Sequence, residues 1–118
     1  MGIEKRRFPR AAVNAVLEYV KYDRVERSLY ITGAKNISEG GLCLITFERL
    51  EPGSEIELKF TLPEINQSIV AHAQVRWVKE LAVEQASPLV VFQQGVQFVN
   101  ISSKDRKTIS EYVLSRQQ

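Results

Sequence analysis

Two short segments of this 118-residue chain carry residue types that are suited to binding a phosphate. The first is an arginine cluster that contains Arg6, Arg7 and Arg10, and the second is the stretch Asn-Ile-Ser-Glu-Gly-Gly at residues 36–41. An arginine side chain presents a planar fork of N–H donors that matches phosphate oxygens and also the O6/N7 edge of guanine. Backbone amides in such a turn can form a concave anion site. Together the two segments predict a site for a phosphate-bearing ligand.

The second segment combines polar side chains with glycines. Asn36 and Ser38 can bond either the nearby backbone or a ligand. Gly40 and Gly41 allow the chain to adopt positive φ and allow a ligand to approach the backbone closely. Each segment also has an ordinary interpretation, because the arginines suit a solvated basic tail, and Asn, Ser and Gly are expected in any hairpin turn. Neither segment alone therefore establishes a site.

A period-two alternation of apolar and polar residues predicts the strands that would position these segments. The clearest case is 54–62, where Ile56, Leu58, Phe60 and Leu62 alternate with polar residues. Because the apolar runs follow one another without intervening helices, they favour an antiparallel sheet. In so short a chain, closure into a six-stranded barrel is the economical way to remove unpaired edges. The predicted strands are residues 12–22, 29–36, 42–47, 54–62, 68–79 and 89–99.

The C-terminal residues change to a helical period. Ile109, Tyr112 and Val113 recur at helical spacing, which predicts a helix over about 103–115 that packs one face on the strands. Ser102 precedes this segment and, with the acidic residue three positions later, resembles the capping box that starts many helices. The expected fold is therefore mainly β, a six-stranded antiparallel barrel with a C-terminal α-helix that covers one end.

Composition narrows the class of protein. The hydrophobic fraction of 44% and the charged fraction of 25% suit one globular domain with a core of its own. No apolar run approaches the roughly 20 residues that a membrane-spanning helix needs. The N-terminus is charged from Glu4 onward, unlike a secretory signal. The single cysteine, Cys43, lies in an apolar run and is expected to be a buried thiol. These features predict a soluble, cytoplasmic protein.

The positive charge is local rather than spread over the chain. The net charge is only +2, whereas a domain that binds nucleic acid usually shows a stronger excess. Four basic side chains nevertheless lie within residues 5–10. This distribution favours a confined anion site over a groove that follows a nucleic-acid backbone, so neither DNA nor RNA is expected as a partner.

Other chemically notable residues fit structural roles. Trp77 ends the apolar face of the strand at 68–79, where core packing is expected, although it could also line a ligand site at the barrel rim. Arg76 falls on the opposite, solvated face. The lone histidine, His72, lacks companions for a metal site. No nucleophile elbow, Walker loop or dinucleotide fingerprint is present, so we expect no enzyme activity, no metal and no cofactor.

The combination of the two segments resembles the signature of the PilZ domain family. Arg6-x-x-x-Arg10 fits the arginine motif that this family carries on an N-terminal arm. Asn36-x-Ser38-x-x-Gly41 fits its turn motif, with Asn at a position that is often Asp. The run Gly-Val-Gln-Phe near the C-terminus is similar to the family's recurrent Gly-x-x-Phe strand. The resemblance spans nearly the whole chain.

This resemblance implies a six-stranded barrel that binds the bacterial second messenger cyclic di-GMP. The arginines would contact phosphates and guanine edges, and the polar side chains of the turn would contact a guanine or a phosphate. The glycines of the turn would allow the ligand to approach the backbone closely. The implied ligand-binding residues are Arg6, Arg7, Arg10, Asn36, Ser38, Gly40 and Gly41, with Trp77 as an additional candidate.

The resemblance also implies that the chain has two parts with different roles. Residues 1–11 would form a flexible basic arm that folds over the ligand, and residues 12–118 would form the barrel domain. With no room for an output domain, the chain would be a single-domain receptor or adaptor that changes its surface and so regulates an unidentified partner protein. Two alternatives stay open: a related barrel that binds only proteins, and a small RNA-binding barrel with aromatic and basic residues along its strands.

Overall fold

Six strands and one helix make up the computed structural model, which describes residues 10–21, 30–81 and 90–116. Of residues 14–16 and 30–32 only the backbone is described. The elements are β1 Ala11–Lys21, β2 Tyr30–Ser38, β3 Gly41–Thr46, β4 Glu55–Leu62, β5 Gln67–Leu81, β6 Val91–Ile101 and α1 Ser103–Leu114. Every strand predicted from the sequence is confirmed, as is the helix.

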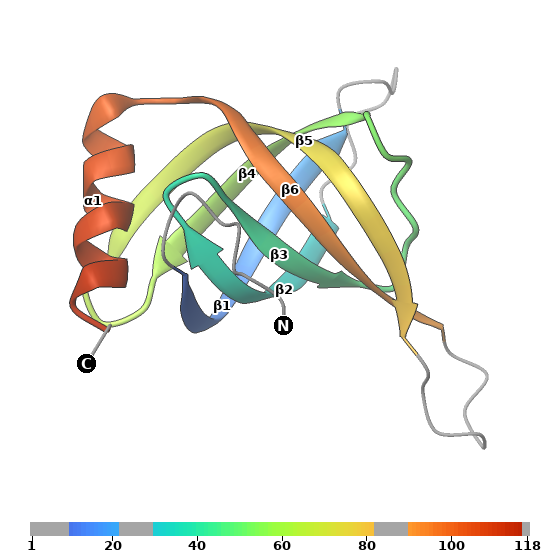
Figure 1. The fold of residues 1–118 in the computed structure, drawn as a ribbon, viewed down its shortest axis with the longest axis horizontal. Coiled ribbons are helices and arrows are strands. Elements are labelled where there is room, and N and C mark those ends of the chain that lie inside the picture. Colours follow the sequence, from blue (N-terminus) through green and yellow to red (C-terminus); the bar gives the residue numbers. More distant parts are fainter. Residues whose placement is uncertain (1–9, 22–29, 82–89, 117–118) are drawn as a thin grey trace, which may run out of the picture.

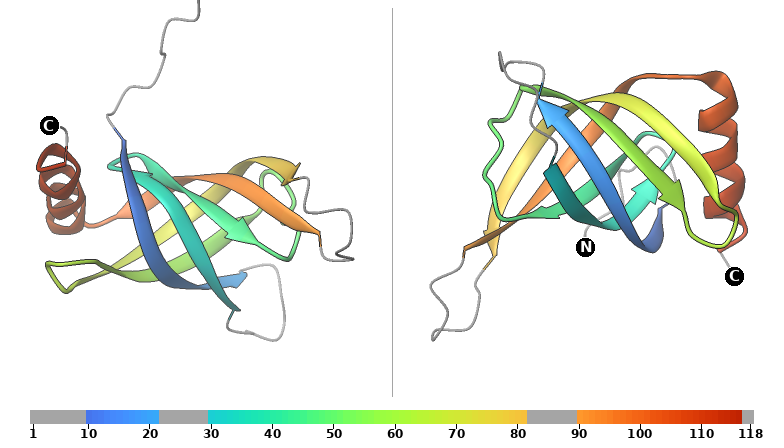
Figure 2. Two further views of the ribbon diagram at one scale, coloured as in Figure 1. Left: turned by 90° about the horizontal axis from the view of Figure 1, so that it is seen from below. Right: turned by 180° about the vertical axis from the view of Figure 1, so that it is seen from behind.

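The strands close into a barrel in which every neighbouring pair is antiparallel (Figures 1 and 2). Their order is β1-β2-β3-β6-β5-β4, and β4 returns to pair with β1. Closure follows from the alternating sequence, because each strand has one apolar face to bury and a closed sheet leaves few unpaired edges. The predicted fold class is therefore confirmed.

The barrel interior is filled by the residues that the alternation selects. On β4, Ile56, Leu58 and Leu62 are fully buried, while the polar residues that alternate with the apolar ones face outward. The neighbouring strand β5 contributes Ile69 and Val75, which are also fully buried. The hydrophobic core therefore lies inside the barrel, and the outer face of the strands is available for a binding site.

Helix α1 covers one end of the barrel, at the left of Figure 1. It buries Ile109, Tyr112 and Val113, the three residues whose spacing predicted it. Its N-cap is Ser102, whose Oγ accepts a hydrogen bond of 3.0 Å from the backbone N–H three residues later. Arg116 bonds Glu64 at 2.5 Å and so ties the end of the helix region to the β4–β5 turn. Within the described ranges, no helix has the length and apolar character needed to cross a bilayer.

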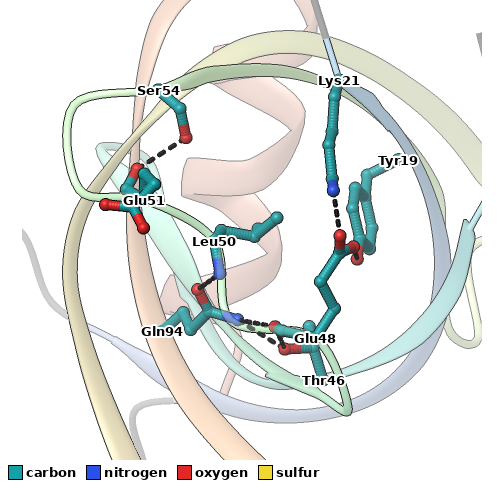
Figure 3. A network of polar contacts seen from close by, with 8 residues as sticks. All are labelled: Tyr19, Lys21, Thr46, Glu48, Leu50, Glu51, Ser54 and Gln94. Atoms are coloured by element: carbon teal, nitrogen blue, oxygen red, sulfur yellow. Dashed lines mark hydrogen bonds and ion pairs between the residues drawn. The ribbon is translucent and has the colours of Figure 1, made fainter. Parts of the chain in front are cut away.

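The loop 47–54 closes the opposite end of the barrel through a buried polar network (Figure 3). Gln94 of β6 is fully buried and accepts a hydrogen bond of 2.9 Å from the Leu50 N–H. Its amide also donates to the Glu48 carbonyl oxygen at 2.8 Å. The Glu48 carboxylate accepts from Tyr19 at 2.8 Å and pairs with Lys21 on β1. The network holds the loop across the barrel opening, where the buried side chain of Leu50 packs against the core.

Strand β5 is much longer than β4, with 15 residues against 8. The pairing between them runs only from Gln67 to Gln74 of β5, whereas β6 continues to pair with β5 as far as Leu81. The last part of β5 therefore extends with β6 beyond the end of β4, toward the lower right of Figure 1.

Candidate functional site

The turn between β2 and β3 is shorter than the sequence suggested. Ser38 and Gly41 form the last pair of the ladder, so only two residues connect the strands. The Ser38 hydroxyl accepts a hydrogen bond of 3.2 Å from the Gly40 N–H and donates one of 3.3 Å to the Gly41 carbonyl oxygen. The serine side chain thereby fixes the turn conformation, as expected for a short hydroxyl side chain in a turn.

Gly41 is required by a close backbone contact. Glycine permits positive φ, but among the described glycines only Gly53 has it, at 93°. At position 41 a contact with the neighbouring strand, not a special dihedral angle, explains the glycine. A Cβ there would lie 2.1 Å from the Val96 carbonyl oxygen of β6. Glycine at position 41 thus lets β3 and β6 approach closely at the edge of the site.

One row of paired residues crosses five strands on the outer face of the barrel. Ala12 pairs with Asn36, Asn36 with Cys43, Cys43 with Gly95, and Gly95 with Trp77. Directly paired residues project from the same face of a sheet. The residues on either side of Cys43 point into the core, so this row faces outward. The candidate site is therefore on the wall of the barrel, not in its interior.

Trp77 is on this outer wall because β5 contains a bulge. The register with β6 shifts between Val75 and Trp77, which makes Arg76 the extra residue. The core position predicted for Trp77 is therefore wrong, and the indole is 40% exposed. It lies over Gly95, where a Cβ would be 2.1 Å from the indole Nε1. The missing side chain at Gly95 is what allows the ring to rest on the neighbouring strand.

The wall contains a pocket of about 300 Å³. Arg10, which immediately precedes β1, and Arg76 of the bulge both line it, together with the exposed indole. Its lining residues are Arg10, Ser38, Gly40, Gly41, Leu42, Cys43, Arg76, Trp77, Gly95, Val96 and Gln97. The pocket thus combines two guanidinium groups, an aromatic face and the glycine-containing turn.

The thiol of Cys43 lies among the pocket-lining residues. The side chain is only 2% exposed, and this burial raises the pKa of the Cys43 thiol above its ordinary value. A hydrogen bond with Gln93 and the positive charges of Lys35 and Arg10 act in the opposite direction without overcoming burial. The thiol is therefore protonated at neutral pH and is a poor nucleophile. The expectation of a buried, inert cysteine is confirmed.

The structure brings together most, but not all, of the residues predicted for the site. Asn36 pairs with Cys43 beside the pocket and does not line it. Arg6 and Arg7 lie outside the described residues. The predicted residues that line the pocket are Arg10, Ser38, Gly40, Gly41 and Trp77.

Arg76 is the main residue that sequence reasoning missed. Strict alternation along β5 assigned it to the solvated face opposite Trp77, but the bulge turns both side chains to the pocket. No residue in this part of β5 is a glycine or proline that would have signalled a bulge. The available signal was the unusual adjacency of an arginine and a tryptophan, a pair of residue types suited to a nucleotide.

The arrangement is suited to binding an anionic ligand that also has a flat ring system. Guanidinium groups bond phosphates, and an exposed indole can stack on a base. Among the described residues there is no cluster of three or more histidine, cysteine, aspartate or glutamate side chains that could hold a metal ion. The chemistry of the pocket is thus that of recognition by charge and stacking.

Comparison with solved structures supports the fold assignment. The chain is similar to the Bacillus subtilis inhibitor of motility MotI/DgrA, with 20% identity, a TM-score of 0.77, and coverage of 98% of this chain and 52% of that one. It is also similar to the PilZ domain of Escherichia coli YcgR, solved with c-di-GMP, at 14% identity, a TM-score of 0.75, and coverage of 96% and 92%. The K. pneumonia MrkH–c-di-GMP complex matches at 21% identity and a TM-score of 0.77, with coverage of 96% and 52%.

The chain spans about half the length of MotI/DgrA and of MrkH. No curated protein matches the sequence significantly. The family model of the PilZ domain matches residues 4–115, which is almost the whole chain. The match includes both sequence motifs, the complete barrel and its terminal helix. This chain therefore belongs to the PilZ domain family.

Proposed function

We propose that the chain is a receptor for cyclic di-GMP and that the pocket on the barrel wall is the binding site. The observation that carries the proposal is the convergence of Arg10, Ser38 and Gly41, which are far apart in sequence or on different elements, on one pocket with Arg76 and Trp77. Membership of the PilZ domain family supports it. The PilZ domain of YcgR and the protein MrkH, which share this fold, have both been solved with that ligand.

Each side chain has a role that follows from its chemistry. Arg10 and Arg76 contact the phosphates or the O6/N7 edge of a guanine. Trp77 stacks on a guanine ring with the face that is turned away from Gly95. The turn at Ser38 contributes backbone amides, and Asn36 acts from beside the pocket. Arg6 and Arg7 add guanidinium groups from the arm, which closes over the bound ligand.

The contacts account for much of the free energy that a micromolar affinity requires. A micromolar dissociation constant corresponds to about 8 kcal/mol. Charge-assisted hydrogen bonds contribute roughly 1.5–3 kcal/mol each, and stacking of a base on an aromatic side chain contributes roughly 1–3 kcal/mol. Two arginines and one indole therefore supply much of the required free energy, from which the cost of ordering an arm is subtracted.

The pocket supports a role in signalling rather than catalysis. The thiol that lines it has a raised pKa, and the Ser38 hydroxyl is engaged with the backbone of its own turn. Among the described residues, no hydrogen bond joins either group to a base that would activate it. We therefore propose that ligand binding acts by changing the surface of the domain, and that a partner protein reads this change.

Isothermal titration calorimetry with cyclic di-GMP tests the proposal directly. We expect saturable binding with a dissociation constant of about 1 μM or below. GTP serves as a control ligand that shares the base but not the cyclic dinucleotide. The absence of heat and of saturation at high ligand concentration would refute the proposal. That result would leave the chain as a protein-interaction module that does not bind nucleotide.

A further inference from the structure

The Arg76 side chain has little packing to hold it at the pocket. It belongs to the extra residue of the β5 bulge and is exposed. A long exposed side chain samples many rotamers, and the loss of that freedom opposes ligand binding. A contact that holds the guanidinium beside the pocket before a ligand arrives would therefore raise the affinity.

Gln74 makes such a contact. It precedes the bulge on β5, and its Oε1 accepts a hydrogen bond of 3.3 Å from Nη1 of Arg76. Its Nε2 donates a second hydrogen bond, of 3.2 Å, to the Gly53 carbonyl oxygen in the loop 47–54. Gln74 is not among the residues that line the pocket. It thus joins a pocket arginine to the loop without being part of the pocket wall.

These two neighbours allow only one orientation of the Gln74 amide. A guanidinium group only donates hydrogen bonds, and a carbonyl oxygen only accepts them. The reversed amide would place its NH₂ against the guanidinium group and its oxygen against the carbonyl oxygen. The Gly53 carbonyl oxygen therefore keeps Oε1 directed at Arg76. A glutamate of the same length would lack the donor, and a methionine would lack both functions.

The loop 47–54 is itself held firmly at this point. The Ser54 N–H donates to the Glu51 carbonyl oxygen at 3.0 Å, and Gly53 has the positive φ that a type II turn requires at its third residue. Val75 donates to Ser54 at 2.9 Å and accepts from the Gly53 N–H at 2.7 Å. The buried network of Figure 3 anchors the same loop from inside the barrel. The carbonyl group that orients the Gln74 amide is therefore fixed.

We propose that Gln74 is a positioning residue, which holds the Arg76 guanidinium at the pocket by coupling it to the loop 47–54. The inference rests on the proposed receptor function, because that function gives Arg76 a ligand to bind. Gln74 uses a single N–H donor of the guanidinium group. The remaining donors stay available for a phosphate or a guanine edge.

NMR relaxation of the arginine Nε–H groups in the ligand-free chain tests the positioning itself, since it reports side-chain order. We expect the Nε–H of Arg76 to be more ordered than that of Arg106, an exposed arginine on α1. Gln74→Met, which keeps the side-chain length but makes neither bond, should remove this order. Gln67→Met is the matched control, as another partly buried glutamine of β5, and should leave Arg76 unchanged. Equal disorder of Arg76 in the wild type and in Gln74→Met would overturn the inference.

Calorimetry with cyclic di-GMP tests the consequence for binding. Gln74→Met should weaken binding about 3- to 10-fold, as expected for the loss of one hydrogen bond. In an Arg76→Ala background the same substitution should change the affinity less than about twofold, because no guanidinium group is left to position. An undiminished effect in that background would overturn the inference, since Gln74 would then act independently of Arg76.

Melting temperatures of all variants check that the barrel is intact. A drop of many degrees in Gln74→Met would assign Gln74 to the stability of the fold and would also overturn the inference. A wild-type chain that does not bind cyclic di-GMP would instead refute the receptor function. The relaxation measurements use no nucleotide, so they decide the role of Gln74 in that case as well.

Discussion

The indole of Trp77 on β5 lies over Gly95 on β6, so close that a Cβ at position 95 would be 2.1 Å from Nε1 and 2.3 Å from Cε2. Gly95→Ala must therefore displace the ring from the wall of the pocket. Trp77 is the only tryptophan of the chain, so its fluorescence reports this displacement without interference. We expect a shift of the emission maximum to longer wavelength as the ring becomes more solvated.

The same substitution should weaken cyclic di-GMP binding. Loss of base stacking costs roughly 1–3 kcal/mol, which corresponds to about 5- to 150-fold in affinity. Calorimetry measures the affinity, and Gly33→Ala is the control because no atom lies within 4 Å of its added Cβ. Unchanged emission and unchanged affinity in Gly95→Ala would show that the ring position is irrelevant to the ligand.

Arg10→Ala and Arg76→Ala should each reduce ligand affinity without unfolding the domain. Both side chains are exposed and line the pocket, so their loss removes charge-assisted bonds to the ligand and little packing. With roughly 1.5–3 kcal/mol for each bond, the expected loss is about 10- to 150-fold. Arg49→Ala is the control, as an exposed arginine on the loop 47–54 that bonds Glu51 at 3.1 Å.

Thermal melting separates a binding role from a structural role for these arginines. Melting temperatures of the three variants should stay within a few degrees of the wild type, as is usual for exposed positions. A large drop for Arg10→Ala would assign that residue to the stability of the barrel instead. Equal affinity of Arg76→Ala and the wild type would exclude the bulge from the site.

Gly41→Ala should destabilise the barrel strongly. The added Cβ would lie 2.1 Å from the Val96 carbonyl oxygen, and a backbone atom cannot move aside without shifting its strand. We expect a loss of about 3 kcal/mol or more in the free energy of unfolding, measured by urea denaturation. Gly33→Ala, also in a strand, should be neutral or stabilising by roughly 0.5–1 kcal/mol. Similar stabilities of the two variants would contradict the close approach of β3 and β6.

The Cys43 thiol should react slowly with alkylating reagents in the folded protein. Burial raises its pKa, so at a given pH a smaller fraction is thiolate than in the unfolded chain. Because the folded state holds this proton more tightly, its contribution to stability is complete below the ordinary thiol pKa and is lost as the pH rises through the raised value. Alkylation rates measured from pH 7 to 10, with and without urea, test this prediction. Rapid reaction of the folded protein near pH 7 would contradict it.

Simple periodicity was enough to predict the scaffold. The alternation in β4 and the helical spacing of Ile109, Tyr112 and Val113 reflect burial of one face, and burial depends on local sequence order. Arg10 and Ser38 could be assigned to a site from a recognisable pair of motifs. Both residues line one pocket, so the described end of the arginine segment lies close to the turn.

The details that sequence could not predict depend on contacts between strands. Arg76 reaches the pocket through a bulge that is defined only by the register with β6. The requirement for glycine at Gly41 comes from a carbonyl oxygen of that same strand, not from the dihedral angles of the turn. Asn36 fits the motif but sits beside the pocket, because pairing with Cys43 fixes its position. Each of these features depends on two strands together, so the sequence of either strand alone does not reveal it.

The unequal lengths of β4 and β5 have a consequence for how the protein could respond to its surroundings. Arg76 and Trp77 belong both to the wall of the pocket and to the strand that β4 leaves uncovered. If a nucleotide and a second binding partner both engage these two side chains, thermodynamic linkage requires each to alter the affinity of the other by the same factor. The concentration of such a partner would then set the nucleotide concentration at which the pocket fills.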